Sequence, residues 1–386
     1  MVLGPNPYCA HGMVTGLSYI ERQADRDLRR SIEQNQRFPF VLAPRQSGKS
    51  SLITRVCARL AAPEFRTAFV NFAMFEPGEI ADFDAFQARI FGECRRSLEL
   101  TEELPSCERF SDGMEQLLAR CPEARLVIFL DDVHALLPAP FKDAFFSILR
   151  NVFNERAMRP EWERVQFVLA GAARPEELLT DRRRSPFNVG EAIVLRDLSL
   201  AETAQACGLM AERLQASAEK LAETVFAQAG GSVFLTQLIL ERLWDCAARA
   251  KATSRPRSSR GNKAQTSEVS ESPYVGCYEG WFEEAVEKIA AEIVARAPGD
   301  IHFQNIKAAL RSRKEAVRVY HRLLLRREVT PAERELLWFT GLGPREGPEI
   351  YCNRIYRQVF HAGGPVDLMT HRRRQLLAIL GGLSWE

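Results

Sequence analysis

The sequence has few of the features that mark metal proteins, disulfide-stapled proteins and membrane proteins. Its nine cysteines include no C-x-x-C pair, and cysteine and histidine do not fall at the spacings of a zinc site. We therefore expect neither a metal–thiolate centre nor a disulfide framework. The longest apolar runs, such as 126–130 and 376–380, fall far short of the ~20 residues that a membrane span needs. A net charge of +2 gives no bulk attraction to nucleic acid or to acidic membranes.

Composition favours an ordinary globular protein. Hydrophobic residues make up 46% and charged residues 26% of the 386 positions, which is typical of a globular chain long enough for two or three domains. The first residues show no basic region followed by an apolar stretch, so we expect no signal peptide. Together these observations predict a cytoplasmic protein with reduced thiols and no membrane partner.

Short β-rich runs alternate with helical patterns between residues 36 and 198, which predicts an α/β fold with a parallel sheet. Most of these runs are almost continuously apolar, as expected for strands that are covered on both faces. Helical periodicity marks the stretches 50–60 and 142–156. The predicted strands are residues 39–43, 67–72, 126–130, 165–171 and 192–195.

The pattern changes after Asp197. Ser199 and Glu202 have the spacing of a capping box, and they open an all-helical stretch. A basic, serine-rich segment with few apolar residues then predicts a flexible linker. Beyond it, three helical patterns and a turn-rich hairpin suggest a winged helix. The predicted parts are an N-terminal entry segment (1–35), a P-loop ATPase core (36–198), a helical lid (199–248), a linker (249–273), a winged helix (274–362) and a C-terminal tail (363–386).

The segment APRQSGKS, residues 43–50, follows a predicted buried strand and opens a predicted helix. In that context the backbone N–H groups of the loop and the N-terminus of the helix can hold phosphates. Lys49 would reach the β- and γ-phosphates of a nucleotide, and the Ser50 hydroxyl would bind Mg²⁺. The first position of the usual G-x-x-x-x-G-K-[ST] pattern is Ala43. Alanine is tolerable there unless the backbone requires a positive φ.

An acidic pair supports the same site. The apolar strand 126–130 ends in Asp131 and Asp132. Asp131 would hold the magnesium shell, and Asp132 would polarise the attacking water. Alone, the pair would be better explained as solvated turn residues, but downstream of a P-loop strand it indicates nucleotide binding. His134 follows closely, and we expect a helix-start histidine at the edge of the site rather than a general base.

These motifs resemble the AAA-like ATPases of the STAND class, signalling ATPases that couple a P-loop core to a helical lid and a winged helix. The resemblance is to a bacterial subfamily whose loop reads PRQ-x-GKSSL, and it covers about residues 19–361. It implies that the nucleotide contacts the loop residues Pro44, Arg45, Gln46, Ser47, Gly48, Lys49, Ser50 and Ser51. The other matching stretches are residues 19–25, 184–190, 230–237 and 351–356.

The resemblance also implies roles for four residues outside the loop. Arg22 lies in the entry segment that the family places beside the adenine. Val233 stands where the lid motif Gly-Gly-x-Pro usually has its proline, so we expect a looser hold on the base. Arg174 follows the fourth strand, where the relatives' sensor arginine reads the γ-phosphate, with a strand-capping surface arginine as an equal alternative. Arg184 opens a family-like motif before the fifth strand, where ring-forming relatives carry an arginine finger.

We therefore expect a switch that depends on ATP, ADP and Mg²⁺ and that controls self-association or the binding of a protein partner. Many relatives have glutamate where this chain has Asp132, one methylene shorter, so hydrolysis of ATP should be slow. Two alternatives remain, a scaffold that binds ATP without turnover and a DNA-binding ATPase similar to origin-recognition proteins. The predicted recognition helix carries Glu333 and Glu335 against one Arg334, so duplex DNA is the less favoured partner.

Overall fold

The computed structural model divides the chain into two compact units, Glu21–Arg196 and a second unit of Met1–Ile20 with Asp197–Glu386. The linker and the C-terminal tail predicted from the sequence lie almost entirely outside the described residues. The structure describes residues 5–14, 16–60, 63–105, 107–181, 185–253, 278–345, 349–361, 364–366 and 368.

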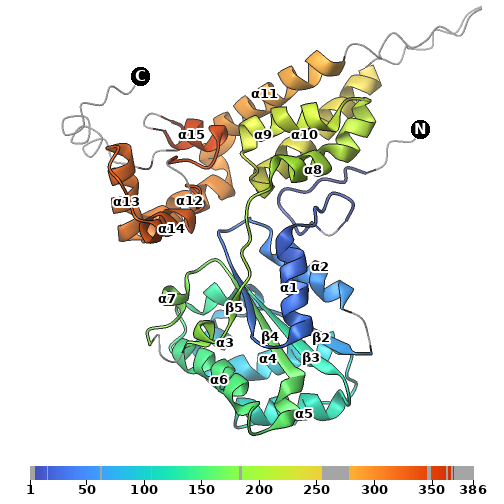
Figure 1. The fold of residues 1–386 in the computed structure, drawn as a ribbon, viewed down its shortest axis with the longest axis vertical. Helices are drawn as coiled ribbons and strands as arrows, with labels where there is room; N and C mark the ends of the chain where they lie inside the picture. The colour runs from blue at the N-terminus through green and yellow to red at the C-terminus, as the bar shows by residue number, and fades with distance from the viewer. Residues whose placement is uncertain are drawn as a thin grey trace, which may run out of the picture. The chain divides into compact units, whose positions relative to one another are not determined.

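The first unit is built on a parallel sheet in the order β2-β3-β4-β1-β5 (Figure 1). This arrangement confirms the predicted α/β fold. All seven residues of β4 are buried, as expected for a central parallel strand. β5 is shorter than predicted, but Ile193 beyond it still donates its N–H to the carbonyl of Phe40. The strands are β1 (Pro39–Leu42), β2 (Phe65–Asn71), β3 (Arg125–Asp131), β4 (Val165–Gly171) and β5 (Glu191–Ala192).

Helices cover this sheet, and an aromatic core lies between them and the strands (Figure 1). Phe86 packs edge-on against Phe145 at 5.0 Å between ring centroids, and Phe38 packs against Phe167 in the same way at 5.6 Å. A core of this kind keeps the strand ends in fixed positions. The helices are α1 (Gln23–Gln34), α2 (Lys49–Arg59), α3 (Pro77–Ala81), α4 (Phe83–Ser97), α5 (Phe110–Arg120), α6 (Lys142–Glu155) and α7 (Pro175–Leu178).

The regular elements of the second unit are all helices among its described residues, and loops join them. The predicted capping box is present at its start, because Ser199 accepts from the N–H of Glu202 and the Glu202 carboxylate accepts from the N–H of Ser199. Within the described stretches, no helix is long and apolar enough to cross a bilayer. The helices are α8 (Leu200–Leu214), α9 (Ala218–Ala229), α10 (Val233–Thr253), α11 (Tyr278–Arg296), α12 (Ile301–Ser312), α13 (Lys314–Leu324), α14 (Pro331–Trp338) and α15 (Arg354–Phe360).

The N-terminal residues belong to this second unit, where they pack on α8 and α10. The Tyr8 hydroxyl donates to the carbonyl of Ala206 and accepts from the N–H of Met210, at 3.1 and 3.0 Å. Its ring lies edge-on to Trp244 at 6.0 Å. The stretch that we predicted as one entry segment is therefore divided, since residues from Glu21 onward belong to the first unit.

The region predicted to be a winged helix contains α11 to α15 and, among its described residues, no strand. In place of a paired ribbon, the N–H of Cys352 donates to the carbonyl of Leu342 at 3.0 Å. The predicted wing tip lies partly outside the described residues, at 346–348. The winged helix therefore stays a prediction.

Candidate nucleotide-binding site

The loop between β1 and α2 has the backbone of a phosphate-binding turn. Gln46 and Gly48 have positive φ values of 59° and 88°, whereas Ala43 is not among the residues with positive φ. The N–H of Ala43 instead donates to the carbonyl of Gly171, at the end of β4. Alanine at the first position of the motif therefore costs no backbone strain. α2 begins at Lys49, so its first N–H groups have no partner within the helix.

Arg22 lies under this loop. Its side chain is 5% exposed, and Nη1 donates to the carbonyl of Ser47 at 3.0 Å and to that of Arg196 at 3.4 Å. A Cβ at Gly48 would come within 2.9 Å of Nη2, so a larger residue there would displace the guanidinium as well as strain the backbone. Arg22 therefore connects the P-loop with the last residue of the first unit. Its predicted contact with the adenine has no test here and stays a prediction.

Lys49 is buried, at 6% exposure, and its Nζ donates to the carbonyl of Pro44 at 2.7 Å. Burial lowers the pKa of Lys49 to about 8, against the attraction of Asp131 and Asp132. The ammonium is thus mostly charged at neutral pH but has only a weak neutral acceptor. A phosphate oxygen would be a stronger partner for it than a peptide carbonyl.

Asp131 ends β3 and is fully buried. Its Oδ1 accepts from the N–H of Asp132 at 2.8 Å, while Oδ2 has no partner among the described residues. Burial raises the pKa of Asp131, and the nearby Ser50 hydroxyl acts in the opposite direction. An orphaned buried carboxylate oxygen beside a hydroxyl is a donor set that suits Mg²⁺, which takes oxygen ligands. The residues present therefore fit the metal that the motif implies.

Asp132 and His134 follow on a turn and a 3₁₀ helix (Val133–Leu136). Asp132 has a positive φ of 52°, a conformation that aspartate adopts more readily than most residues. The Nδ1 atom of His134 lies 3.6 Å from Asp132 Oδ1 and accepts from the N–H of Ala172 at 3.3 Å. Its Nε2 lies 3.2 Å from Nη2 of Arg45. A neutral imidazole has one acceptor nitrogen, so it cannot accept from Ala172 and Arg45 at once.

His134 makes more contacts in the site than its sequence position predicts. It does start a short helix, as expected, but it also touches the P-loop, the acidic pair and the residue after β4. Its position three residues after Asp131 was the available signal. The long-range partner, Arg45, could not be inferred from that spacing.

The remaining predicted residues are placed less decisively. Arg174 is the residue before α7, where its side chain lies 3.8 Å from the carboxylates of Glu176 and Glu177. Arg184 lies outside the described residues. Val233 begins α10 in the second unit. Roles for these three residues stay predictions.

Comparisons with known proteins point to one family. A family model described as an AAA-like domain matches residues 11–252. A protein named as an uncharacterized WD repeat-containing protein, from Synechocystis sp., is 30% identical over 257 residues. That match covers 62% of this chain and 21% of the relative, so the chain spans about a fifth of the relative's length.

Solved structures of low similarity were also found. The ORC2 protein of Aeropyrum pernix in its ADP form is 14% identical, with a TM-score of 0.48 and coverage of 94% of this chain and 86% of that one. The ORC1 protein of Aeropyrum pernix in complex with DNA is 13% identical, with a TM-score of 0.45 and coverage of 79% and 75%. At these scores neither structure carries a functional argument.

Proposed function

Because this chain belongs to the AAA-like domain family, we propose that it binds ATP with Mg²⁺ at the loop of residues 43–51 and acts as a slowly hydrolysing switch of the STAND type. The observation that carries the proposal is the pair of unsatisfied groups at the loop. Among the described residues, the buried ammonium of Lys49 donates to one carbonyl, and Oδ2 of the buried Asp131 carboxylate has no hydrogen-bond partner. A magnesium-bound triphosphate would satisfy both.

In this proposal each polar residue of the site has a separate task. The N–H groups at the start of α2 and the Lys49 ammonium bind phosphate oxygens. Ser50 and Asp131 hold Mg²⁺, which neutralises charge on the phosphates when bound. Asp132 orients the attacking water, and its short side chain keeps turnover slow. Slow turnover suits a switch, because the ATP state must persist to carry a signal.

Arg22 could transmit a change in the P-loop to the rest of the chain. One guanidinium nitrogen binds both the Ser47 carbonyl in the P-loop and the Arg196 carbonyl at the end of the first unit. If phosphate binding shifts the Ser47 peptide, the second hydrogen bond weakens or strengthens with it. We propose that this shared donor couples the P-loop to the segment that leads into the helical second unit.

The output of the switch is proposed to be self-association or the binding of a protein partner. The Synechocystis relative contains a segment similar to this chain, and its name says that it also contains WD repeats. A nucleotide-binding core in the same protein as repeats that bind other proteins is what a switch of the STAND type would need. It does not identify the partner of this chain.

The structure gives one reason to rank DNA below a protein partner. Arg334 is the only basic residue of α14, and it is 8% exposed with Nη1 bound to the carbonyl of Glu349 at 2.7 Å. Glu333 is held by Thr330 and Arg322. The proposed recognition helix therefore has no free basic side chain among its described residues with which to contact phosphates.

Titration with a fluorescent ATP analogue tests the proposed site. Lys49→Ala should abolish measurable binding, because the change removes the charge that faces the phosphates. Lys288→Ala on α11 is the matched control, since that lysine is exposed and lies in the other unit; it should bind as wild type does. Circular dichroism would establish that both variants are folded. Unchanged affinity in a folded Lys49→Ala protein would show that the site is misplaced.

A further inference from the structure

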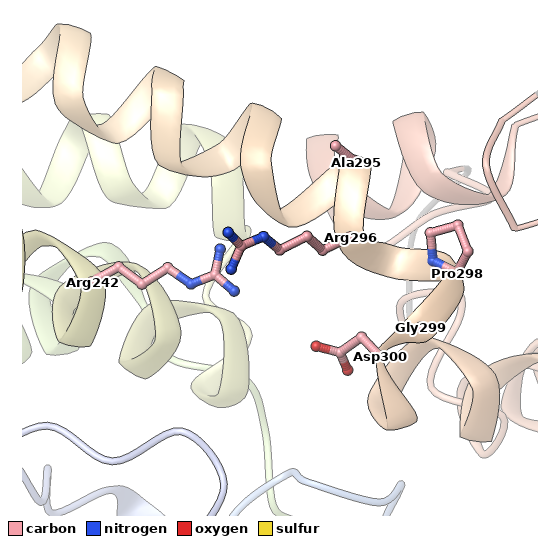
Figure 2. A pocket seen from close by; sticks show the side chains of 6 residues that line it. All are labelled: Arg242, Ala295, Arg296, Pro298, Gly299 and Asp300. Carbon is pink, nitrogen blue, oxygen red and sulfur yellow. The ribbon is translucent and has the colours of Figure 1, made fainter.

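A second basic site lies in the helical unit, away from the P-loop. A cavity of about 470 Å³ that is largely open to solvent is lined by residues of α10, the end of α11 and the turn into α12 (Figure 2). Arg242 comes from α10, Arg296 is the last residue of α11, and Asp300 is the residue before α12. All of these elements belong to the second unit.

The two arginines of this cavity face each other. Figure 2 shows the guanidinium groups of Arg242 and Arg296 pointing toward one another, with the Asp300 carboxylate directed into the same space. Two like charges at such an approach repel unless an anion lies between them. Within the described part of the chain, neither arginine forms an ion pair. Nη1 of Arg242 is buried and lacks a hydrogen-bond acceptor there.

Asp300 is the one carboxylate among the residues that line the cavity, and one of its oxygens already has a partner. Oδ1 of Asp300 accepts from the N–H of His302 at 2.8 Å, which caps α12. One carboxylate also has too few oxygens to satisfy two guanidinium groups, each of which carries five N–H donors. The cavity therefore keeps an excess of one positive charge and several unsatisfied donors. The positive end of the α12 dipole adds to this field.

We propose that this cavity binds a small molecule that carries a phosphate group. A phosphate dianion presents three terminal oxygens in the geometry that paired guanidinium groups bind best. A ligand held by both arginines would bridge α10 to the junction of α11 and α12, and would stabilise the packing of the lid helix on the C-terminal helices. The site is independent of the proposed nucleotide function.

Inorganic phosphate is the probe for this site, measured by calorimetric titration at constant ionic strength. Full-length Lys49→Ala protein serves as the background, so that the P-loop does not contribute. Saturable binding with one phosphate per chain is expected. Arg242→Gln and Arg296→Gln should each weaken it by at least about tenfold, because each removes charge-assisted hydrogen bonds. Arg318→Gln, an exposed arginine on α13, is the matched control and should leave the affinity unchanged.

Asp300→Asn supplies an independent test. Asparagine keeps the cap of α12 but removes a negative charge from the cavity, so phosphate should bind several-fold more tightly. Weaker binding in that variant would overturn the proposal, as would absence of saturable binding in the background protein. Arg296 is exposed, so its variant should fold even if Arg242→Gln does not, and unchanged affinity in folded Arg296→Gln would also overturn the proposal. A short DNA duplex is the last arm: binding to DNA but not to phosphate through these arginines would replace a small-molecule site with a nucleic-acid contact.

Discussion

Acidification should destabilise the helical unit through one buried histidine. His302 is 3% exposed, its ring stacks on Phe234 at 4.0 Å, and Nε2 lies 2.6 Å from the hydroxyl of Tyr356. Burial, with a smaller contribution from His11, lowers the pKa of His302 to about 3. The folded protein therefore keeps this imidazole neutral where the unfolded chain would protonate it.

The size of the effect follows from the two pKa values. Below pH 6.5 the unfolded state binds a proton that the folded state does not, so stability falls with decreasing pH until the folded pKa near 3 is reached. Between pH 8 and pH 5 the loss is about 2 kcal/mol, from 1.36 kcal/mol per pKa unit over the interval from 6.5 to 5. Above pH 6.5 the histidine should contribute no slope.

Urea unfolding at pH 8 and pH 5 measures this term. Tryptophan emission is a suitable signal, because Trp244, Trp281 and Trp338 all lie in the second unit. His302→Gln cannot titrate but still offers the Tyr356 hydroxyl a polar partner. At pH 8 the free energy of unfolding of the variant should be lower than that of wild type. Between pH 8 and pH 5 it should fall by about 2 kcal/mol less than that of wild type. Equal losses in both proteins would refute the assignment of the acid sensitivity to His302.

The nucleotide site gives two further predictions. Asp132→Asn should preserve ATP binding and lower turnover by about a hundredfold, the lower end of what a positioned acid or base contributes, whereas Asp131→Asn should make ATP binding insensitive to Mg²⁺. Phosphate release measures turnover, and ATP titrations with and without Mg²⁺ measure the metal dependence. A magnesium requirement that survives in Asp131→Asn would contradict these roles. Arg22→Gln should weaken ATP binding about tenfold, because it releases the Ser47 carbonyl. Arg26 is exposed on the helix that follows Arg22, so Arg26→Gln should bind ATP as wild type does. Equal ATP affinities of the two variants would contradict the role of Arg22.

The sheet and the loop were predictable because their signals are local. Apolar runs such as 126–130 identify buried strands by themselves, and the loop motif directly follows one of them. Asp131 could be placed beside the loop because the carboxyl ends of parallel strands meet at one edge of the sheet. Even the unusual Ala43 could be judged in advance, since only a positive φ would have excluded it.

Contacts between distant parts of the chain were not predictable. Tyr8 packs against helices some 200 residues away in sequence, and the residues next to it in the sequence do not predict that contact. The hydrogen bonds of Arg22 to the carbonyls of Ser47 and Arg196 could not be inferred from its sequence neighbours either, and its contact with the adenine stays a prediction. α12 was not among the predicted helical stretches, although its buried Phe303, Ile306 and Leu310 recur at helical spacing.

The central claim is that the nucleotide bound in the first unit controls the second. Amide hydrogen exchange of the full chain with ADP, and with a slowly hydrolysed ATP analogue, tests it most directly. Exchanging one nucleotide for the other should change protection at residues 43–51, at Arg196, and also in the helices of the second unit. Protection that differs only around residues 43–51, with the second unit identical in both nucleotide states, would contradict it.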